Sequence, residues 1–257
     1  MTAETDKLLH DILPGTVNGL SIIITGGTTG IGRIAAIALA QQGANVLFAG
    51  RDQQHLDDTL ASVKGQEFSG NLHGIVADLA TSEGIDHLFS EADERFSKLD
   101  VLINNAALAF QSVSEGDYAD WEEVVKTNVL GYMGCTRKAL DRMRANKSGH
   151  IVNIGSMSAD IREQNSSIYV ATKSAIQGFS EALRKEVNEA GIKVTLIEPG
   201  AVGTDMQPVS VPDQQEKEEN LEMLKAEDIA GAILFALCQP KRCDVVNIQI
   251  RPHLQLI

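Results

Sequence analysis

The sequence predicts an α/β protein with a doubly wound parallel sheet of about seven strands and helices on both faces. Short apolar runs alternate with longer segments whose apolar residues recur at helical spacing, as in "GRIAAIALAQQG" and "GIDHLFSEADERF". Most of the short runs are continuously apolar, which is typical of strands covered on both faces. No internal repeat, low-complexity tract or linker divides the chain, so residues 1–257 are expected to form a single domain.

The expected strands follow one another at regular intervals. They are residues 21–25, 45–50, 72–77, 101–105, 150–155, 193–198 and 245–250. Long helices are expected around 118–145 and 166–190. Two segments fall outside this rhythm: residues 1–18 form a polar extension, and residues 203–222 carry two prolines and a charge run. The second segment is either a mobile lid over a substrate or a solvated connection.

Composition and charge exclude several classes of protein. Hydrophobic residues make up 43% and charged residues 22%, which is ordinary for a soluble globular protein. The formal net charge of -13 argues against non-specific binding to nucleic acid or anionic lipid, because such a field would repel both. The N-terminus has no basic region ahead of an apolar run, and no apolar stretch reaches the roughly 20 residues that cross a bilayer. A cytoplasmic protein that binds no membrane is therefore expected.

Cysteine and histidine show no pattern of metal binding. The six histidines are scattered without ligand spacing, and the three cysteines form no CxxC pair. We expect no metal site, and reduced thiols at Cys135, Cys238 and Cys243.

A glycine-rich turn follows the first expected strand. Residues 25–32, "TGGTTGIG", place Gly26, Gly30 and Gly32 between an apolar strand and an alanine-rich helix. Glycines allow a tight turn and the close approach of a pyrophosphate, while the helix start offers unpaired N–H groups and the positive end of its dipole. This context of strand, turn and helix predicts a Rossmann-like, dinucleotide-binding domain.

The end of the second strand indicates which dinucleotide is bound. An Asp or Glu at this point usually contacts the free ribose 2′-hydroxyl of NAD. This chain has Gly50 followed by Arg51, whose planar cation suits a 2′-phosphate. Asp52 lies one step past the strand and is well placed to cap the next helix. The sequence therefore favours NADP(H) over NAD(H).

Tyr169 and Lys173 are four residues apart on an expected helix, so their side chains share one face. A phenol with a pKa of about 10 is a poor base at neutral pH, and an adjacent ammonium favours its ionised form. Such a pair could exchange a proton with a carbonyl or alcohol oxygen. Ser156 ends a strand thirteen residues upstream, at the sheet edge where open α/β sheets bind ligands.

Together these motifs resemble those of the short-chain dehydrogenase/reductase family. "TGGTTGIG" resembles the family's cofactor turn, "NNAA" at 104–107 its NNAG motif, and "IEPGAVGT" its PG motif. Asn128 in "TNVLG" matches the catalytic asparagine, and Ser156, Tyr169 and Lys173 match the Ser and YxxxK. The resemblance implies a nicotinamide-dependent oxidoreductase acting on CH–OH donors. It implies a cofactor site formed by Gly26, Thr28, Thr29, Gly30, Ile31, Gly32, Arg51, Asp78, Leu79, Asn105, Ala106, Ala107, Tyr169, Lys173, Pro199, Gly200, Val202 and Thr204.

The resemblance also implies roles for single residues. Asp78 would lie near the adenine, and Thr204 would contact the nicotinamide carboxamide. Asn128 would hold a water that links Lys173 to solvent. The long helices would form the interfaces of a homodimer or homotetramer.

Three features depart from the family pattern. Ala107 replaces the glycine of NNAG, which adds a methyl group beside the cofactor. Gly155 stands where many members have a second serine, which leaves Ser156 as the matched hydroxyl. The ending "IRPHLQLI" lacks the common VDGG pattern and resembles that of a subgroup including hydroxy-acid and serine dehydrogenases.

The expected reaction is hydride transfer between NADP(H) and a carbonyl or secondary alcohol. Tyr169 would act as acid and base, Ser156 would bond the substrate oxygen, and Lys173 would lower the pKa of the phenol. The alternatives are an NAD(H)-dependent alcohol or hydroxy-acid dehydrogenase and a non-catalytic NADP(H)-binding regulator. The expected wall of a partly apolar substrate pocket comprises Leu108, Met157, Ile161, Gln164, Val202 and Met206.

Overall fold

The computed structural model describes residues 15–207 and 209–255. It contains a seven-stranded sheet in the order β3-β2-β1-β4-β5-β6-β7, in which every pairing is parallel. The predicted doubly wound α/β fold is therefore confirmed. The strands are β1 Ser21–Thr25, β2 Asn45–Gly50, β3 Asn71–Val76, β4 Val101–Asn104, β5 Gly149–Ile154, β6 Ile192–Pro199 and β7 Asn247–Ile250.

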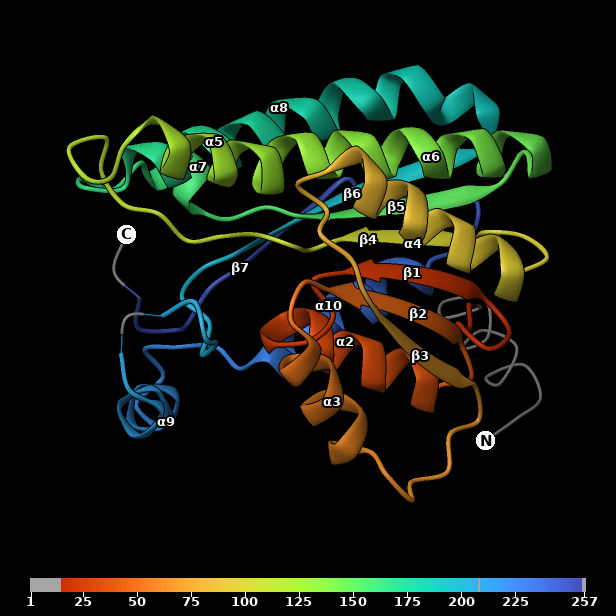
Figure 1. The fold of residues 1–257 in the computed structure, drawn as a ribbon, viewed down its shortest axis with the longest axis horizontal. Helices are drawn as coiled ribbons and strands as arrows, with labels where there is room; N and C mark the ends of the chain where they lie inside the picture. Colours follow the sequence, from red (N-terminus) through yellow and green to blue (C-terminus); the bar gives the residue numbers. More distant parts are fainter. Residues whose placement is uncertain (1–14, 208, 256–257) are drawn as a thin grey trace, which may run out of the picture.

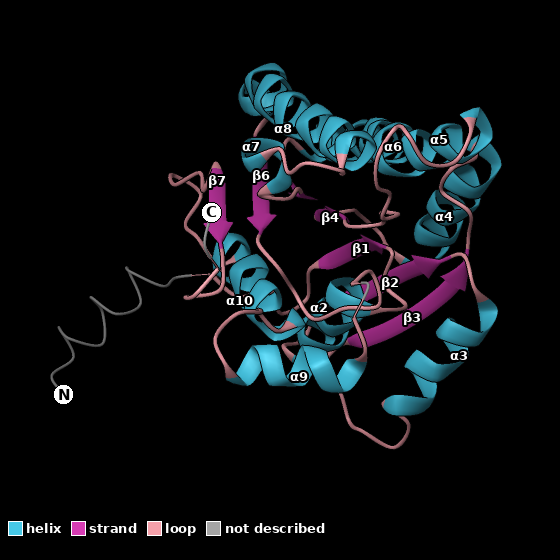
Figure 2. Ribbon diagram, turned by 90° about the vertical axis from the view of Figure 1, so that its left-hand side faces the viewer, coloured by secondary structure: helices cyan, strands magenta, loops and turns pink. Residues whose placement is uncertain are grey.

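Helices cover both faces of the sheet (Figure 1). One face carries α2 Gly30–Gln41, α3 Gln53–Ser62 and α10 Ala226–Leu237, and the other carries α4 Ser82–Arg95, α6 Gly131–Asn146 and α8 Ser167–Val187. The same two layers lie on either side of the strands in the view turned by 90° (Figure 2). Each layer packs on its own apolar cluster, and burial of these clusters is the main source of stability.

Burial along the strands follows their place in the sheet. The central strands β1 and β4 are buried at every residue, as their continuously apolar sequences predict. The edge strands β3 and β7 instead alternate between more and less exposed residues. Only one flank of an edge strand is paired, which explains why these two depart from the continuous pattern.

The sheet reverses its winding between β1 and β4. Strand β1 pairs with β2 on one side and with β4 on the other, so the connections after β1 and β4 run in opposite directions. Ligands of open α/β sheets bind at such a switch point, outside the carboxyl ends of the strands. The glycine turn and the residues after β4, β5 and β6 all lie at this edge.

The helix expected over 118–145 is interrupted. Helix α5 (Tyr118–Val125) is followed by a π-helical segment, Lys126–Leu130, before α6 begins at Gly131. A π-turn inserts one extra residue into the helical ladder and is frequent at functional sites. This segment contains Asn128. The other long helix, expected over 166–190, is α8 followed by a 3-10 turn at Asn188–Ala190.

The N-terminal extension is only partly described, because residues 1–14 lie outside the described residues. Within the expected polar extension, Val17 is 1% exposed and belongs to the core cluster beneath α2 and α10. The described end of the extension therefore joins the hydrophobic core at Val17. The hydrophobic side chain is buried against the sheet, as its transfer free energy favours.

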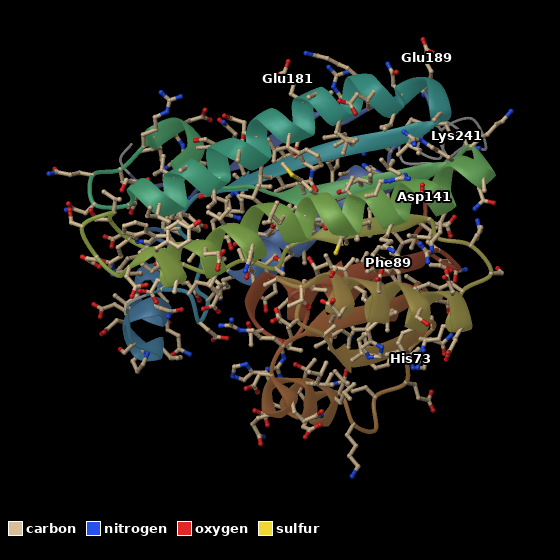
Figure 3. All side chains as sticks on the ribbon, turned by 45° about the horizontal axis from the view of Figure 1, so that its top comes forward. His73, Phe89, Asp141, Glu181, Glu189 and Lys241 are labelled. Atoms are coloured by element: carbon tan, nitrogen blue, oxygen red, sulfur yellow. The ribbon has the colours of Figure 1, made fainter. Side chains whose placement is uncertain are left out.

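The segment after β6 runs past the carboxyl edge of the sheet. It contains α9 (Val211–Glu219), which Figure 1 shows standing apart from both helical layers. Asp141 on α6 and Glu181 on α8 are exposed (Figure 3). Among the described helices, none is long and apolar enough to span a membrane.

Candidate active site

The glycine turn is shaped by its neighbours. Gly26 and Gly30 have φ values of +63° and +50°, in the left-handed region that glycine adopts without strain. The side-chain amide of Asn105 donates to the carbonyl oxygens of Thr25 at 3.1 Å and Gly26 at 2.9 Å. A Cβ atom on Gly32 would collide with Gly26 O and the Asn105 amide. Close packing therefore fixes this turn against the end of β4.

The start of α2 is open to a ligand. Its N-cap residue Thr29 makes no side-chain capping hydrogen bond, and the first turn carries no acidic residue. In contrast, Asp52 and Thr81 cap α3 and α4 with their side chains. Helix termini carry unpaired N–H groups and positive dipole ends that bind phosphates. The turn and the α2 N-terminus therefore fit the pyrophosphate of a dinucleotide.

Position 50 at the end of β2 is confined by Thr28. A Cβ atom on Gly50 would collide with the hydroxyl and methyl groups of Thr28. Arg51 follows, with a half-exposed guanidinium whose Nη1 lies 2.7 Å from Oε1 of Glu123. Asp52 caps α3 as expected, accepting a hydrogen bond from the His55 amide at 2.9 Å. Arg51 therefore extends from this strand end as an exposed cation paired with Glu123.

The residues after β3 lie next to this strand end. The Ala77 amide donates to Gly50 O at 2.9 Å. Asp78 is exposed, and its carboxylate accepts a hydrogen bond from the Ala80 amide at 3.0 Å. Leu79 is 6% exposed and packs in the core beneath α4 and α6. Asp78 is therefore exposed to solvent near Arg51, while the buried side chain of Leu79 anchors this loop to the hydrophobic core.

Asn128 fixes the segment that follows β4. Its Oδ1 accepts from the Leu108 amide at 2.7 Å, and its Nδ2 donates to the Leu108 carbonyl at 2.9 Å. Nδ2 also lies 3.2 Å from the Thr172 hydroxyl on α8. The residue is 1% exposed. Its side chain thus joins the π-turn to the loop and to the helix that carries Tyr169.

Helix α8 brings the predicted Tyr and Lys together with Ser156. The ammonium of Lys173 lies 5.6 Å from the centre of the Tyr169 ring, and Tyr169 and Ser156 line the same cavity. Lys173 is 3% exposed and donates to the Ile154 carbonyl at 3.0 Å. The last residue of β5 therefore anchors the lysine, and the loop directly after it presents the serine.

Burial controls the protonation of this pair. Burial raises the pKa of Tyr169 to about 12, while the Ser156 hydrogen bond acts in the opposite direction and the Glu163 charge adds to the rise. Burial lowers the pKa of Lys173 to about 8. Burial, and not Lys173, therefore sets the direction of the Tyr169 pKa shift, while the lysine ammonium donates to the Ile154 carbonyl.

Tyr132 completes the surroundings of Lys173 and is a residue that the motifs did not indicate. Its hydroxyl donates to the same Ile154 carbonyl at 3.0 Å, and its ring centre lies 5.9 Å from the lysine ammonium. It is 1% exposed. Tyr132 follows Asn128 by four residues, so the spacing within "NVLGY" could have placed both on one helix face.

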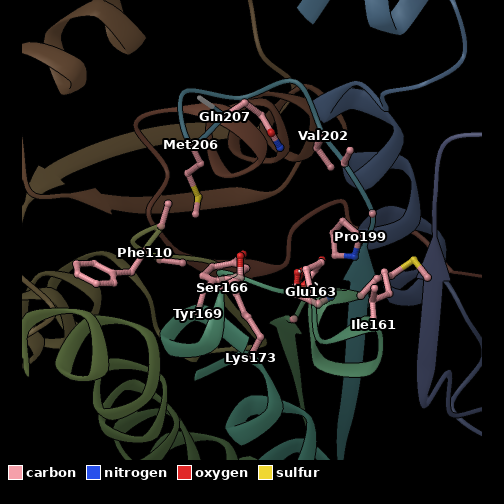
Figure 4. A pocket seen from close by; sticks show the side chains of 18 of the residues that line it. Phe110, Ile161, Glu163, Ser166, Tyr169, Lys173, Pro199, Val202, Met206 and Gln207 are labelled. Atoms are coloured by element: carbon pink, nitrogen blue, oxygen red, sulfur yellow. Dashed lines mark hydrogen bonds between the residues drawn. The ribbon is translucent and has the colours of Figure 1, made fainter. Parts of the chain in front are cut away.

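A cavity of about 800 Å³ opens over the catalytic candidates. Figure 4 shows Tyr169 and Lys173 on one side of it, with Met206 and Gln207 across from them. The predicted residues that line it are Ile31, Asn105, Ala107, Ser156, Met157, Ile161, Gln164, Tyr169, Lys173, Pro199, Gly200, Val202, Thr204 and Met206. Predicted cofactor-binding residues and predicted catalytic residues therefore line the same cavity.

Other predicted residues lie outside the cavity wall. Leu108 is held by Asn128 behind the loop, whereas its successors Ala109 and Phe110 line the cavity. Asn128 itself is buried below the wall. The predicted cofactor residues that do not line this cavity are Gly26, Thr28, Thr29, Gly30, Gly32, Arg51, Asp78, Leu79 and Ala106. Most of these belong to the strand ends and the turn from β1 to β3.

Several polar lining residues carry no sequence motif. Glu163 and Ser166 come from the loop between Ser156 and Tyr169, and Gln255 comes from the C-terminal segment. The other polar lining residues without a motif are Gln111, Glu115, Ser158, Asn165 and Gln207. Residues between two catalytic candidates could have been expected near the site, but nothing local marks Glu115 or Gln255.

Comparison with known proteins gives the family. The family model described as short chain dehydrogenase matches residues 21–215. An uncharacterized oxidoreductase of Staphylococcus aureus is 34% identical over 98% of this chain and 100% of its own length. Another, of Staphylococcus haemolyticus, is 35% identical over 92% of this chain and 98% of its own length.

A solved structure is similar in fold. The crystal structure of levodione reductase superimposes with a TM-score of 0.79 at 24% identity, covering 90% of this chain and 96% of that chain. At this identity the likeness establishes the fold alone, whereas the family match and the relatives extend through the glycine turn and the cavity residues. The chain belongs to the short-chain dehydrogenase family, whose members are oxidoreductases that bind a nicotinamide dinucleotide.

Proposed function

We propose that the protein is an NADP(H)-dependent oxidoreductase that interconverts a carbonyl and a secondary alcohol. One observation carries the proposal: Tyr169, Ser156 and Lys173 meet at a cavity that also reaches Ile31 beside the glycine turn. A substrate in this cavity would lie within reach of a proton donor and of a dinucleotide on the turn. Hydride transfer requires this proximity.

The residues of the turn and the strand ends would hold the cofactor. The uncapped start of α2 would take the pyrophosphate, and Arg51 would take the 2′-phosphate. Thr204, whose methyl group lies beside Gly30, would contact the carboxamide, and Asp78 would lie near the adenine. When bound, the nicotinamide would supply or accept a hydride.

Tyr169 would exchange the proton on the substrate oxygen. Burial is the main cause that raises the pKa of Tyr169 to about 12. The phenol would therefore be neutral at physiological pH and able to donate its proton, which favours carbonyl reduction. Ser156, which lines the same cavity as Tyr169, would donate to the same substrate oxygen and stabilise the developing alkoxide.

Lys173 and Asn128 would serve this proton exchange. The buried ammonium of Lys173 would stabilise negative charge on the phenol and hold the cofactor ribose. We propose that Asn128 acts by positioning, since its side-chain atoms bind Leu108 and Thr172. The family resemblance implies a water between Asn128 and Lys173. Such a water would hydrogen-bond to backbone groups of the π-turn, where the regular helical hydrogen bonds are interrupted.

The segment 203–222 would close over the substrate. Met206 and Gln207 line the cavity on the side opposite Tyr169 (Figure 4). The side chain of Gln214 on α9 donates to the carbonyl oxygens of Val209 at 2.9 Å and Thr204 at 3.3 Å. Helix α9 and the loop would therefore move together.

We also propose a homodimer or homotetramer in the cytoplasm. Tyr118, Leu130 and Met133 are exposed on the helices α5 and α6 and the π-turn between them, and large apolar side chains exposed on these helices suit an interface. The unpaired cysteines, with Cys135 buried, suit a reducing compartment. Size-exclusion chromatography with light scattering would test the oligomer, and a monomer would refute it.

The test of the proposed function is a substrate panel. Purified protein is mixed with NADPH or NADH and neutral aliphatic, aromatic and charged ketones, and with the oxidised cofactors and the matching alcohols. We expect turnover with at least one compound and faster rates with NADPH. Faster rates with NADH would support the alternative of an NAD(H)-dependent alcohol or hydroxy-acid dehydrogenase. Tight NADPH binding without any turnover would support a non-catalytic regulator.

A further inference from the structure

Most of the charged side chains that line the cavity are negative. Glu115 and Glu163 line the cavity, and Lys173 is the one cation among the described residues that do so. Lys173 is buried and donates to the Ile154 carbonyl. A carboxylate or phosphate entering the cavity would therefore meet two carboxylates and one buried ammonium, which already donates to the backbone and which the proposed function assigns to Tyr169 and the cofactor ribose.

Glu163 is the acid that lies near the reacting centre. Its Oε1 accepts a hydrogen bond from the Ser158 hydroxyl at 2.9 Å. Glu163 and Tyr169 line the same cavity, and the Glu163 charge adds to the rise in the pKa of Tyr169 that burial causes. Figure 4 shows Glu163 on the same side of the cavity as Tyr169 and next to Ile161. A substrate oxygen at Tyr169 would thus share its cavity with the Glu163 carboxylate.

The nearest cation along the chain leaves Glu163 available. Arg162 precedes Glu163 but donates its Nε to the Ala159 carbonyl at 3.2 Å and does not line the cavity. Among the described residues, no Lys or Arg forms an ion pair with Glu163. One hydroxyl hydrogen bond leaves a carboxylate with acceptor sites to spare.

The segment that borders the cavity has the same sign of charge. Helix α9 carries Asp213, Glu216, Glu218 and Glu219 against a single Lys217. Its Glu218 carboxylate lies against Gly203, at the start of the loop that lines the cavity. With a formal net charge of -13 on the whole chain, the field at this entrance attracts cations and repels anions.

We infer that the substrate carries a protonated amine close to its reacting carbon, and that Glu163 binds this ammonium. The substrate class is amino alcohols and the corresponding amino ketones, and substrates with a carboxylate or phosphate are disfavoured. This inference rests on the proposed function. In the direction of reduction, the ketone carbon would accept a hydride from the reduced nicotinamide and the ketone oxygen would accept the phenol proton of Tyr169; the reverse oxidation starts from the Tyr169 phenolate, which takes up the hydroxyl proton. The ketone and the unchanged ammonium remain.

The experiment compares three alcohols of similar size and different charge. These are 1-amino-2-propanol, 2-butanol and 3-hydroxybutyrate, oxidised with NADP⁺ near neutral pH, where the amine is protonated. We expect kcat/KM to fall in the order amine, neutral alcohol, carboxylate. The step from amine to neutral alcohol should be about five- to tenfold, the size expected for one partly exposed, hydrogen-bonded charge pair. Equal or faster turnover of the carboxylate would overturn the inference.

Variants identify the carboxylate responsible. Glu163→Gln should remove most of the preference for the amine over 2-butanol, and Glu163→Lys should reverse the order of amine and carboxylate. Both variants also change the pKa of Tyr169, but this affects all three alcohols alike, so the ratio isolates recognition. Glu94→Gln on α4, exposed and remote from the cavity, removes the same charge and should leave the ratio unchanged. An unchanged ratio in Glu163→Gln would refute the assignment.

A binding measurement separates this inference from the proposed function. Isothermal titration of the NADPH-loaded protein with the same three compounds ranks their affinities without any turnover. Tighter binding of the amine, lost in Glu163→Gln, would support the inference even if no compound is oxidised. Binding of the carboxylate as tight as that of the amine would refute it, whether or not the enzyme reduces neutral ketones.

Discussion

The ion pair between Arg51 and Glu123 makes cofactor preference testable by a pair of substitutions. Nη1 of Arg51 lies 2.7 Å from Oε1 of Glu123, and both side chains are more than half exposed, at 57% and 55%. If Arg51 binds a 2′-phosphate, Glu123 competes with that phosphate for the guanidinium and repels it. Glu123→Gln should therefore tighten NADPH binding, whereas Arg51→Ala should weaken it.

The exposure of the pair sets the size of both effects. An exposed ion pair is worth about 0.2–1 kcal/mol, so its removal in Glu123→Gln should lower the dissociation constant of NADPH by up to about fivefold. Hydrogen bonds to a charged group contribute about 1.5–3 kcal/mol, so Arg51→Ala should raise that constant by about ten- to hundredfold. NADH has no 2′-phosphate, and its affinity should change by less than about twofold in both variants.

Isothermal titration of each variant with NADPH and NADH measures these constants. Arg95→Ala, which breaks an ion pair with Glu91 on α4, is a matched control and should alter neither affinity. Raising the salt concentration should weaken NADPH binding more than NADH binding, because the extra contact is between charges. Equal losses for both cofactors in Arg51→Ala would refute the proposed role of this residue.

Three further predictions concern His150, near the amino end of β5, and two residues close to the site, Tyr132 and Gly32. The pKa of His150 is lowered from 6.5 to about 4, chiefly by burial and then by the Lys193 charge. The free energy of unfolding should therefore fall by about 3 kcal/mol as the pH is lowered from above 6.5 to about 4. Urea unfolding of the His150→Gln variant over the same pH range should show a smaller fall. Tyr132→Phe removes the second donor to the Ile154 carbonyl and should lower the free energy of unfolding by about 1 kcal/mol, while Lys173 still satisfies that oxygen. Gly32→Ala forces the turn apart and should weaken NADPH at least about tenfold, with a loss of about 1–3 kcal/mol in stability; unchanged affinity would contradict the role of the turn.

The sheet could be predicted because its central strands are buried on both faces. Burial on both faces requires apolar side chains at successive positions, so β1 and β2 have the predicted bounds. The prediction is less accurate at β7, which was expected to begin at residue 245 and begins at Asn247. Edge strands lack a neighbour on one side, and their bounds depend on pairing more than on composition.

The interruption at Asn128 could not be predicted in the same way. Helices α5 and α6 share an amphipathic pattern with the π-turn between them, and one inserted residue changes that pattern too little to be visible. The insertion is explained by tertiary contacts, since Asn128 must reach both the Leu108 backbone and Thr172. The motif identified the residue, but only the fold shows what its side chain binds.

The catalytic candidates were found by motif, whereas their electrostatics came from packing. Proximity of Tyr169 and Lys173 follows from helical spacing. The opposite shifts of their pKa values arise from burial, which depends on residues distant in sequence such as Tyr132 and Ile154. The charge of the cavity likewise depends on Glu163, which lies in a loop without periodicity.

Single-turnover kinetics would test the central claim most directly. Protein loaded with NADPH is mixed with a carbonyl substrate found in the panel, and the loss of cofactor absorbance is followed for the unaltered chain and for Tyr169→Phe. Tyr169 is proposed to give the proton that neutralises the alkoxide, so the substitution should slow the reaction by about 10²–10⁴-fold while NADPH affinity stays the same. A Tyr169→Phe protein that transfers the hydride at the unaltered rate would contradict the account.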